Sequence, residues 1–302
     1  MGQQHTLASA VSLSGIGLHS GVAVNLRLCP APAHTGIVFK RTDLDGFVIE
    51  AQARYTARVS YATSLMKKGV LISTTEHLLS ALAGMDVDNA IVEIDNLELP
   101  IVDGSALPFV KLIRQAGVRR QRAQRSYARI LKPLELQDGN KKIAVYPSET
   151  FSVTYSIAFP HPVIGAETHD FTPYPGTYEG NVSPARTFGF LAEVEMLLKN
   201  GLIKGGTMEN VIVLDEDSVL NPEGLRFPDE FCRHKVLDLI GDLSLFGRPV
   251  IGHVVADRAG HAMHARLVSE LLRRKDCWTV TQNPPMRATT PLPAVAEMAA
   301  SA

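Results

Sequence analysis

The sequence has few cysteines and no spacing that would join them into a framework. Cys29, Cys232 and Cys277 are an odd number, and no two of them form a C-x-x-C pair. Small domains stabilised by disulfides carry paired cysteines, and the usual cysteine-ligated zinc sites carry C-x-x-C spacing. We therefore expect reduced thiols, as in a cytosolic protein, and neither a disulfide framework nor a cysteine-ligated zinc.

The chain also lacks an excess of charge of either sign. It has 30 Lys and Arg against 31 Asp and Glu, a formal net charge of −1. Nucleic acids and anionic membranes are usually bound by a strongly basic face, which this balance does not favour. There is no apolar run long enough to span a bilayer and no signal-peptide pattern. The sequence therefore predicts a cytoplasmic protein that binds no nucleic acid and has no integral membrane segment.

The stretch 231–243 is the most informative part of the chain. It contains no proline, is apolar throughout and follows two acidic residues that favour the positive end of a helix dipole, so we predict a helix. At 3.6 residues per turn, His234, Asp238 and Asp242 share one face of this helix. An imidazole and a carboxylate one turn apart are able to bind the same metal ion. The alternative is a solvated polar stripe on an amphipathic helix.

A second histidine stands in a matching context far upstream. We predict a helix over 73–84 that contains His77 and ends at a glycine. His77 and His234 each stand seven residues before a glycine, Gly84 and Gly241, which we interpret as helix ends. After each glycine the chain continues into a strand and a further helix. We interpret this as a duplicated α+β unit whose two equivalent helices face each other across a domain junction.

The length and composition suit such an arrangement. The 302 residues are 45% hydrophobic and 20% charged, which is typical of a globular protein with roughly two domains. We predict an α+β fold of two similar duplicated domains, packed helix layer to helix layer with the active site between them. The predicted parts are an N-terminal domain at 1–122, an exposed basic linker at 119–129, a C-terminal domain at 127–283 with a β-α-β insert at about 190–215, and a Pro/Ala-rich tail at 284–302.

The insert has no counterpart in the first half of the chain. The sequence predicts a helix over 191–200, then a glycine-rich turn that includes Gly206, then a strand over 211–214. Apolar residues recur in the helix at i, i+3 and i+7, so it carries one apolar stripe. The stripe is either the packing face of the insert or the lining of an apolar passage. It consists of Leu191, Val194 and Leu198.

If the two helices face each other, His77, His234 and Asp238 form a metal site of two histidines and one carboxylate. Three protein ligands leave coordination positions open, as catalytic sites do. The set suits hydrolytic zinc and also non-haem Fe(II). Glu76 favours hydrolysis, because a carboxylate beside a ligand is able to take a proton from a water at the metal, and an oxygenase needs no such base.

Glu76 has a second interpretation. Ser73 and Glu76 have the spacing of a capping box, in which both side chains bond to the backbone at the start of a helix. The residues by themselves leave both interpretations open.

A hydrolase also needs an acid for the leaving group. His253, His261 and His264 follow the predicted helix 231–243, and His261 stands at the turn between the strand 252–257 and the next helix. A side chain there is able to project into a cleft. Asp242, on the metal face of its helix, is able to keep that imidazole protonated. The alternative for His261 is a solvent-exposed loop histidine.

Several short motifs follow one another along the chain. Those in the first half are GIGLHSG at 15–21, RTD at 41–43, STTEHL at 73–78 and PIVDGSA at 100–106. Those in the second half are FPHP at 159–162, RTFGF at 186–190, RHKVLD at 233–238 and GHA at 260–262. With these motifs the chain resembles the UDP-3-O-acyl-N-acetylglucosamine deacetylase family, zinc enzymes of the committed step in bacterial lipid A synthesis. The resemblance is weak at 164–183 and in the tail.

The resemblance implies a role for each candidate residue. The implied catalytic set is a zinc site at His77, His234 and Asp238, a general base at Glu76, a general acid at His261 oriented by Asp242, and an oxyanion donor at Thr187. The implied substrate contacts are Lys235 near the diphosphate, Phe159 and Lys141 at the nucleotide, Phe188 at the sugar, and the insert with Gly206 around the fatty acyl chain.

The expected reaction is hydrolysis of the N-acetyl group of the UDP-sugar, with release of acetate. The expected cofactor is one Zn²⁺, for which Fe²⁺ is able to substitute in the cell, and we expect no obligate protein partner. Two other functions have the same sequence features. They are an Fe(II) oxygenase with the same ligands and a non-enzymatic module that binds nucleotide sugars.

Overall fold

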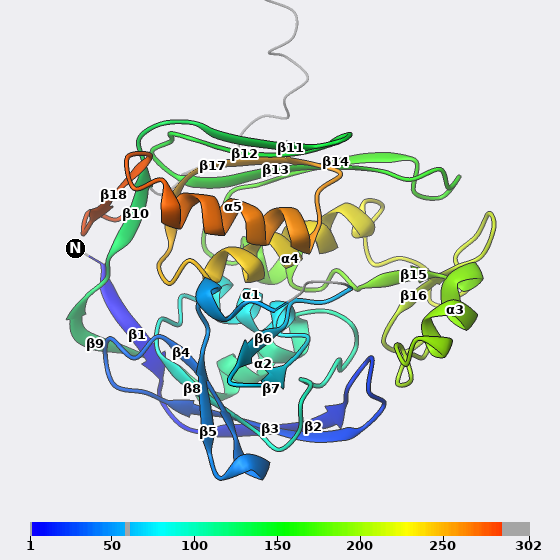
Figure 1. Cartoon of the computed structure of the whole chain (residues 1–302), viewed down its shortest axis with the longest axis horizontal. Helices are drawn as coiled ribbons and strands as arrows, with labels where there is room; N and C mark the ends of the chain where they lie inside the picture. Colours follow the sequence, from blue (N-terminus) through cyan, green and yellow to red (C-terminus); the bar gives the residue numbers. More distant parts are fainter. Residues whose placement is uncertain (1, 58–60, 286–302) are drawn as a thin grey trace, which may run out of the picture.

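The structure, a computed structural model, describes residues 2–57 and 61–285. Two sheets form outer layers of the molecule, and helices lie between them (Figure 1). The predicted α+β class and the packing of one helix layer on the other are therefore confirmed. The predicted domain boundaries stay predictions. All but the first two residues of the predicted tail 284–302 lie outside the described residues.

The first half of the chain forms a five-stranded sheet. Its strand order is β2 (Val11–Ile16), β3 (Ala23–Pro30), β8 (Ala90–Ile94), β4 (Ile37–Arg41) and β5 (Phe47–Glu50), with β4 and β8 parallel and the other neighbours antiparallel. Alternate residues of β3, namely Val24, Leu26 and Leu28, are buried, which is the pattern of a sheet with one solvated face. The inner face is covered by α1 (Glu76–Gly84) and α2 (Leu107–Ala116) (Figure 1).

Short elements connect this half. They are η1 (Thr42–Leu44), η2 (Ala53–Tyr55), and the hairpin of β6 (Leu65–Lys67) and β7 (Val70–Ile72).

The second half forms a larger, mixed sheet. Its path is β11 (Leu134–Asp138), β12 (Lys141–Tyr146), β17 (Val250–Asp257), β10 (Tyr127–Ile130) and β18 (Trp278–Thr281), and β17 also pairs with β13 (Phe151–Ala158), which pairs with β14 (Ala166–Phe171). A short helical turn, η3 (Tyr178–Val182), follows β14. The inner face is covered by α4 (Glu230–Ser244) and α5 (His261–Arg273) (Figure 1).

The two halves repeat one order of elements. After α1 the chain enters β8 and then α2, and after α4 it enters β17 and then α5, as predicted. Both strands are internal to their sheets, since β8 lies between β3 and β4 while β17 has β12, β10 and β13 as neighbours. This repeat places α1 and α4 in direct contact at the centre of the molecule.

Only one of the two glycines that suggested helix ends lies at one, and both admit a close contact from another part of the chain. Gly241 lies inside α4, so its assignment as a helix end was wrong, whereas Gly84 is the last residue of α1. A Cβ atom on Gly241 would collide with the carbonyl group of Glu76, and one on Gly84 would collide with the ring of Tyr178. Both positions therefore need glycine because another part of the chain packs directly on the helix.

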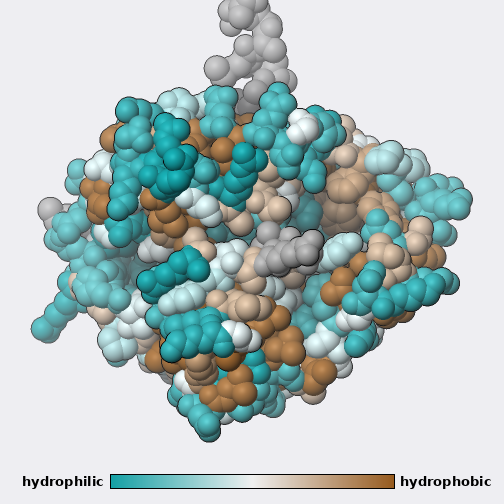
Figure 2. All heavy atoms as spheres, in the orientation of Figure 1, coloured by the Kyte–Doolittle hydropathy of each residue, from teal (hydrophilic) through white to brown (hydrophobic). Residues whose placement is uncertain are grey.

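The insert has the predicted β-α-β order. It consists of β15 (Phe188–Phe190), η4 (Leu191–Glu193), α3 (Val194–Lys199) and β16 (Ile212–Leu214), with the two strands parallel, and it projects from one side of the molecule (right in Figure 1). The packing-face alternative for the apolar stripe is wrong, because Leu191 and Leu198 are 45% and 46% exposed while Leu197 is buried. The other alternative, the lining of an apolar passage, stays a prediction. Leu191 belongs to η4 and not to α3, so the stripe does not run along a single helix, and Figure 2 shows hydrophilic and hydrophobic residues interspersed here.

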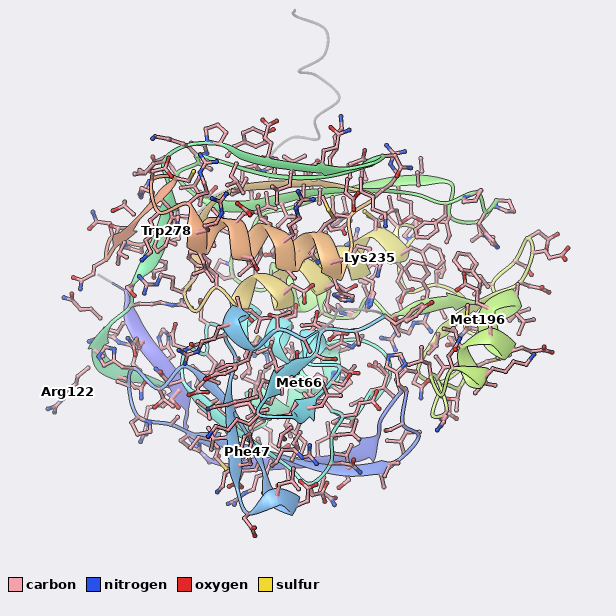
Figure 3. All side chains as sticks on the ribbon, in the orientation of Figure 1. Phe47, Met66, Arg122, Met196, Lys235 and Trp278 are labelled. Carbon is pink, nitrogen blue, oxygen red and sulfur yellow. The ribbon has the colours of Figure 1, made fainter. Side chains whose placement is uncertain are left out.

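The predicted basic linker is mostly a strand. β9 (Val118–Gln124) pairs antiparallel with β1 (Gln3–Leu7), and β10 follows almost at once. Backbone pairing with β1 tolerates arginines because their side chains reach solvent, as Arg122 does in Figure 3. Arg125, by contrast, is buried and pairs with Asp86 and Asp88. The charged composition therefore predicted exposure correctly for β9 but not for the end of the linker, and it did not predict the backbone conformation.

The described part of the chain bears on two of the expectations, those about the cysteines and about membrane-spanning helices. All three cysteines have free thiols there. Within residues 2–57 and 61–285, no helix combines the length and the apolar character that crossing a bilayer requires.

Candidate metal centre and active site

The first turn of α1 lies against the middle of α4, and three polar side chains meet at this crossing. His77 comes from α1, while His234 and Asp238 lie one turn apart on α4. Asp238 Oδ1 lies 3.7 Å from His77 Nε2 and 3.4 Å from His234 Nε2. All three side chains are buried, and their potential ligand atoms lie within 4.8 Å of one another. The structure thus brings the three candidate ligands together.

The protonation of these groups suits a metal ion. Burial lowers the pKa of His77 to about 3 and also lowers that of His234, so both imidazoles are neutral. His234 Nδ1 donates to the carbonyl oxygen of Ala185 at 3.0 Å, which leaves the Nε2 lone pair directed at the site. Although burial opposes it, the neighbouring His234 imidazole and Lys235 ammonium hold the pKa of Asp238 well below its usual range.

One carboxylate oxygen of this set lacks a partner. Lys235 Nζ donates to Asp238 Oδ2 at 2.9 Å, but Asp238 Oδ1 is buried and accepts no hydrogen bond from any described residue. An unpaired, ionised oxygen in the protein interior is costly unless a cation stands beside it. Two neutral Nε2 atoms and this oxygen therefore fit a divalent ion such as Zn²⁺.

Glu76 is the first residue of α1, and its carboxylate lies inside the site. Glu76 Oε2 accepts a hydrogen bond from the backbone N–H of Thr63 at 3.0 Å, and Oε1 lies 4.0 Å from His261 Nε2. Burial raises the pKa of Glu76 to about 8. The capping-box alternative is wrong, because Ser73 is outside the helix and accepts from Ser64 Oγ, and no side chain of a described residue caps α1.

His261 begins α5 and directs its Nε2 atom toward the same site. Its Nδ1 donates to Asp242 Oδ2 at 2.7 Å, and its Nε2 lies 3.8 Å from Asp238 Oδ2. The side chain is 13% exposed, so the alternative of a solvent-exposed loop histidine is wrong. Burial lowers its pKa, but the charges of Asp242 and Asp238 prevail and raise it to about 9. Thr63 Oγ1 donates to Asp242 Oδ1 at 2.5 Å.

A buried ion pair fixes the segment that holds both His234 and Thr187. Arg186 is 2% exposed, and its Nε donates to Glu230 Oε1 at 2.9 Å at the start of α4. Ala185, the residue before it, accepts from His234, and Thr187, the residue after it, donates its N–H to the Gly104 carbonyl oxygen at 2.8 Å. Because Arg186 joins this segment to α4, the tautomer of His234 and the position of Thr187 depend on the same contact.

One cavity of about 160 Å³ is lined by the three candidate ligands together with Glu76 and His261. Thr187, Phe188 and Lys235 form part of its wall, and the Lys235 ammonium lies 5.3 Å from the centre of the Phe188 ring. In Figure 3, Lys235 lies on the side of α4 that faces the insert, where Met196 is labelled. Phe159 stands behind the wall, with its ring centre 5.7 Å from that of Phe188.

Two of the candidate substrate residues lie apart from the cavity. Lys141 is exposed at the start of β12, in the sheet of the second half. Gly206 lies in the insert, and a Cβ atom there would be 3.7 Å from the side chain of Leu18. Leu18 is a lining residue, whereas neither candidate is among the described residues of the lining. The structure therefore does not place Lys141 or Gly206 in the cavity itself.

The lining also contains residues that the sequence did not mark as candidates, among them His19 and Tyr61. His19 lies in the glycine-rich turn 15–21, and both its ring nitrogens are buried without a partner among the described residues. Glu98 holds this turn by accepting the backbone N–H of His19 at 2.8 Å. Tyr61 also lines the cavity, is 57% exposed and has a left-handed backbone with φ of +66°. The turn motif was a signal for His19, but no local pattern marks Tyr61.

Comparison with known proteins gives a consistent result. The chain matches the sequence model of a family described as LpxC, UDP-3-O-acyl N-acetylglycosamine deacetylase, over residues 4–273. Three relatives that are named UDP-3-O-acyl-N-acetylglucosamine deacetylase show high identity to it. They come from Solibacter usitatus (54% identity, covering 88% of this chain and 90% of the relative), Myxococcus xanthus (50%, covering 92% and 88%) and Geobacter sp. strain M21 (45%, covering 95% of each).

Proposed function

The chain belongs to the LpxC family of UDP-3-O-acyl-N-acetylglucosamine deacetylases of lipid A biosynthesis, and from this premise we propose that it works as a zinc-dependent amide hydrolase in the cytoplasm. Its substrate is the UDP-sugar with its fatty acyl chain, and its products are the free glucosamine derivative and acetate. The observation that carries the zinc proposal is the convergence of two neutral Nε2 atoms on the unpaired Asp238 Oδ1, with Glu76 and His261 beside them.

His77, His234 and Asp238 would hold the ion. When bound, Zn²⁺ supplies Lewis acidity that polarises the amide carbonyl and makes water easier to deprotonate. The protein supplies the proton transfers and the orientation of the substrate.

Glu76 accepts the proton of the attacking water. Its carboxylate is held by the Thr63 N–H through Oε2, which leaves Oε1 directed toward the site. Burial raises its pKa to about 8, so the ionised carboxylate is a stronger base than that of an exposed glutamate. The hydroxyl of Thr187 donates a hydrogen bond to the oxyanion that the attack creates.

His261 donates a proton from Nε2 to the departing glucosamine nitrogen. The Asp242 carboxylate accepts a hydrogen bond from Nδ1, which keeps the ring oriented with Nε2 toward the site and favours the protonated form of His261. Cleavage of the C–N bond then releases acetate and the free amine, and Glu76 holds the proton taken from water.

Different residues around the cavity contact different parts of the remaining substrate. Lys235 provides a positive charge for the diphosphate, and Phe188, supported by Phe159, provides an apolar face for the sugar. We assign the nucleotide to the side that includes Lys141, and the acyl chain to the insert near Gly206 and Leu18. Because Lys141 and Gly206 lie outside the cavity lining, these two assignments require the substrate to extend beyond it.

The decisive test is acetate release from the UDP-sugar substrate with and without a chelator. We expect the chelated protein to lose turnover and Zn²⁺ to restore it, and metal analysis should find about one catalytic ion per chain. His234→Ala should lose both metal and activity. His253→Ala is the matched control, because this histidine bonds to Ser152 on the solvent side of β17 and should retain both.

The alternatives predict other outcomes in the same assay. Full turnover after complete metal removal would refute the zinc proposal. Acetate release without oxygen excludes an Fe(II) oxygenase. A non-enzymatic binding module would bind the UDP-sugar normally without metal and release no acetate.

A further inference from the structure

The carboxylate that orients His261 has a second histidine donor. His264 lies on α5 one turn after His261, and its Nδ1 is 2.8 Å from Asp242 Oδ2, the oxygen that also accepts from His261 Nδ1 at 2.7 Å. His264 is fully buried, and of these two histidines only His261 lines the cavity. Asp242 is therefore held on one oxygen by two imidazoles and on the other by the Thr63 hydroxyl.

A tyrosine on the inner face of the sheet completes this arrangement. The hydroxyl of Tyr155, a fully buried residue of β13, lies 3.0 Å from His264 Nε2 and 2.8 Å from the carbonyl oxygen of Ala259. Burial lowers the pKa of His264, so the ring is neutral and carries one proton. With that proton on Nδ1 for Asp242, Nε2 is an acceptor, so the single proton of the Tyr155 hydroxyl is shared between Nε2 and the carbonyl oxygen of Ala259.

Tyr155 thus acts on the backbone and the side-chain surroundings of His261 together. Ala259 stands two residues before His261, and its carbonyl oxygen is anchored by the same hydroxyl that meets His264. The start of α5 and the Asp242 carboxylate are therefore both tied to β13, a rigid internal strand. A buried carboxylate needs several donors to keep one orientation, and removing a single donor leaves it under-bonded.

From this geometry we infer that His264 is a positioning residue of the deacetylase: its Nδ1–H holds the Asp242 carboxylate in the orientation that directs His261 Nε2 at the leaving nitrogen. His264 itself does not touch the substrate. The inference rests on the proposed role of His261 as the general acid. According to this inference, the contact between Asp242 and His261 is not sufficient to orient the imidazole for proton transfer. The hydrogen bonds from Tyr155 through His264 to Asp242 are needed as well.

The test compares His264→Asn with His264→Gln. The amide nitrogen of Asn lies where Nδ1 was and is able to donate to Asp242, whereas that of Gln lies where Nε2 was and faces Tyr155. We expect Asn to retain kcat within about threefold and Gln to lose about tenfold or more, a fraction of the full contribution of a general acid. KM for the UDP-sugar and the metal content should not change in either variant.

Two further variants keep the comparison informative. Tyr155→Phe removes the hydroxyl from both His264 and Ala259 and should lower kcat without changing KM. His261→Ala tests the premise, and it should lose most of the turnover. Thermal unfolding of each variant, measured with metal bound, separates a loss of positioning from a loss of folding.

Each contrary result has a distinct meaning. If His261→Ala is inactive while Asn and Gln at position 264 give equal kcat, the positioning inference is wrong and the proposed acid stands. If His261→Ala retains full turnover, the proposed acid is wrong and the inference falls with it. Asp242, His261 and His264 are also close enough to hold an ion. A second metal equivalent that disappears with His264→Asn would replace the hydrogen-bonding role by ligation and overturn the inference.

Discussion

Gly241→Ala tests whether the close crossing of α1 and α4 builds the metal site. A Cβ atom at this position would overlap the Glu76 carbonyl oxygen and lie 2.9 Å from its carbon and 3.1 Å from Glu76 Cα. These are backbone atoms, so no side-chain rotation relieves the overlap, and the two helices must separate. Glu76 and His77 would then move away from His234 and Asp238, which stay on α4.

The expected magnitude follows from two opposing effects. Glycine to alanine inside a helix usually stabilises by about 0.5–1 kcal/mol. Overpacking in a well-packed core costs about 1–3 kcal/mol, and backbone contacts favour the upper part of that range. We therefore expect a net loss of about 1–2 kcal/mol, with a fall in Tm of roughly 2–4 °C for each kcal/mol. A displacement near 1 Å should also lower kcat by about 100-fold.

The assay is thermal unfolding together with zinc titration and acetate release. Gly180→Ala is the control, because this glycine also lies in a helical segment, η3, and no described atom lies within 4 Å of the added Cβ. The control should leave Tm unchanged or slightly raised. If Gly241→Ala retained wild-type Tm, zinc affinity and turnover, the steric explanation of this glycine would be refuted.

Three other substitutions test the proposed roles. Glu76→Ala should slow acetate release by about 10²–10⁴-fold, as expected for a general base. Its metal content should stay normal, and a loss of metal would instead indicate a ligand. Asp242→Asn should move the alkaline limb of the kcat profile to lower pH. Burial lowers the pKa of His261 and the Asp242 charge raises it, so without that charge the imidazole loses its proton at lower pH. An unmoved limb would mean that Asp242 does not act on the catalytic acid. Gly206→Leu should impair the long-acyl substrate and spare a truncated analogue with zinc content unchanged, since each excluded methylene forfeits about 0.8 kcal/mol. Equal losses for both substrates would indicate a folding defect, and no loss for either would place the acyl passage elsewhere.

The sequence by itself determined the features that depend on local periodicity. His234, Asp238 and Asp242 share a face of α4 because residues four apart in a helix lie one turn apart, whatever the helix packs against. The same holds for the repeated order of helix, strand and helix after His77 and His234, which follows from where apolar periods change.

Tertiary packing decided what local patterns left open. The spacing of Ser73 and Glu76 suits both a capping box and a base, and the choice depends on α4 standing opposite the first turn of α1. Likewise, Gly241 had the appearance of a helix end, although its function is to admit a second backbone.

The surroundings of His261 show the limit most clearly. Asp242, His264 and Tyr155 come from two helices and a strand, and their hydrogen bonds require each element to be in place within a few tenths of an ångström. A local period reports which face a residue occupies, but it carries no information about which distant residue stands opposite. That information arises when the sheets and helices pack, because steric fit and the pairing of buried polar groups then select one arrangement.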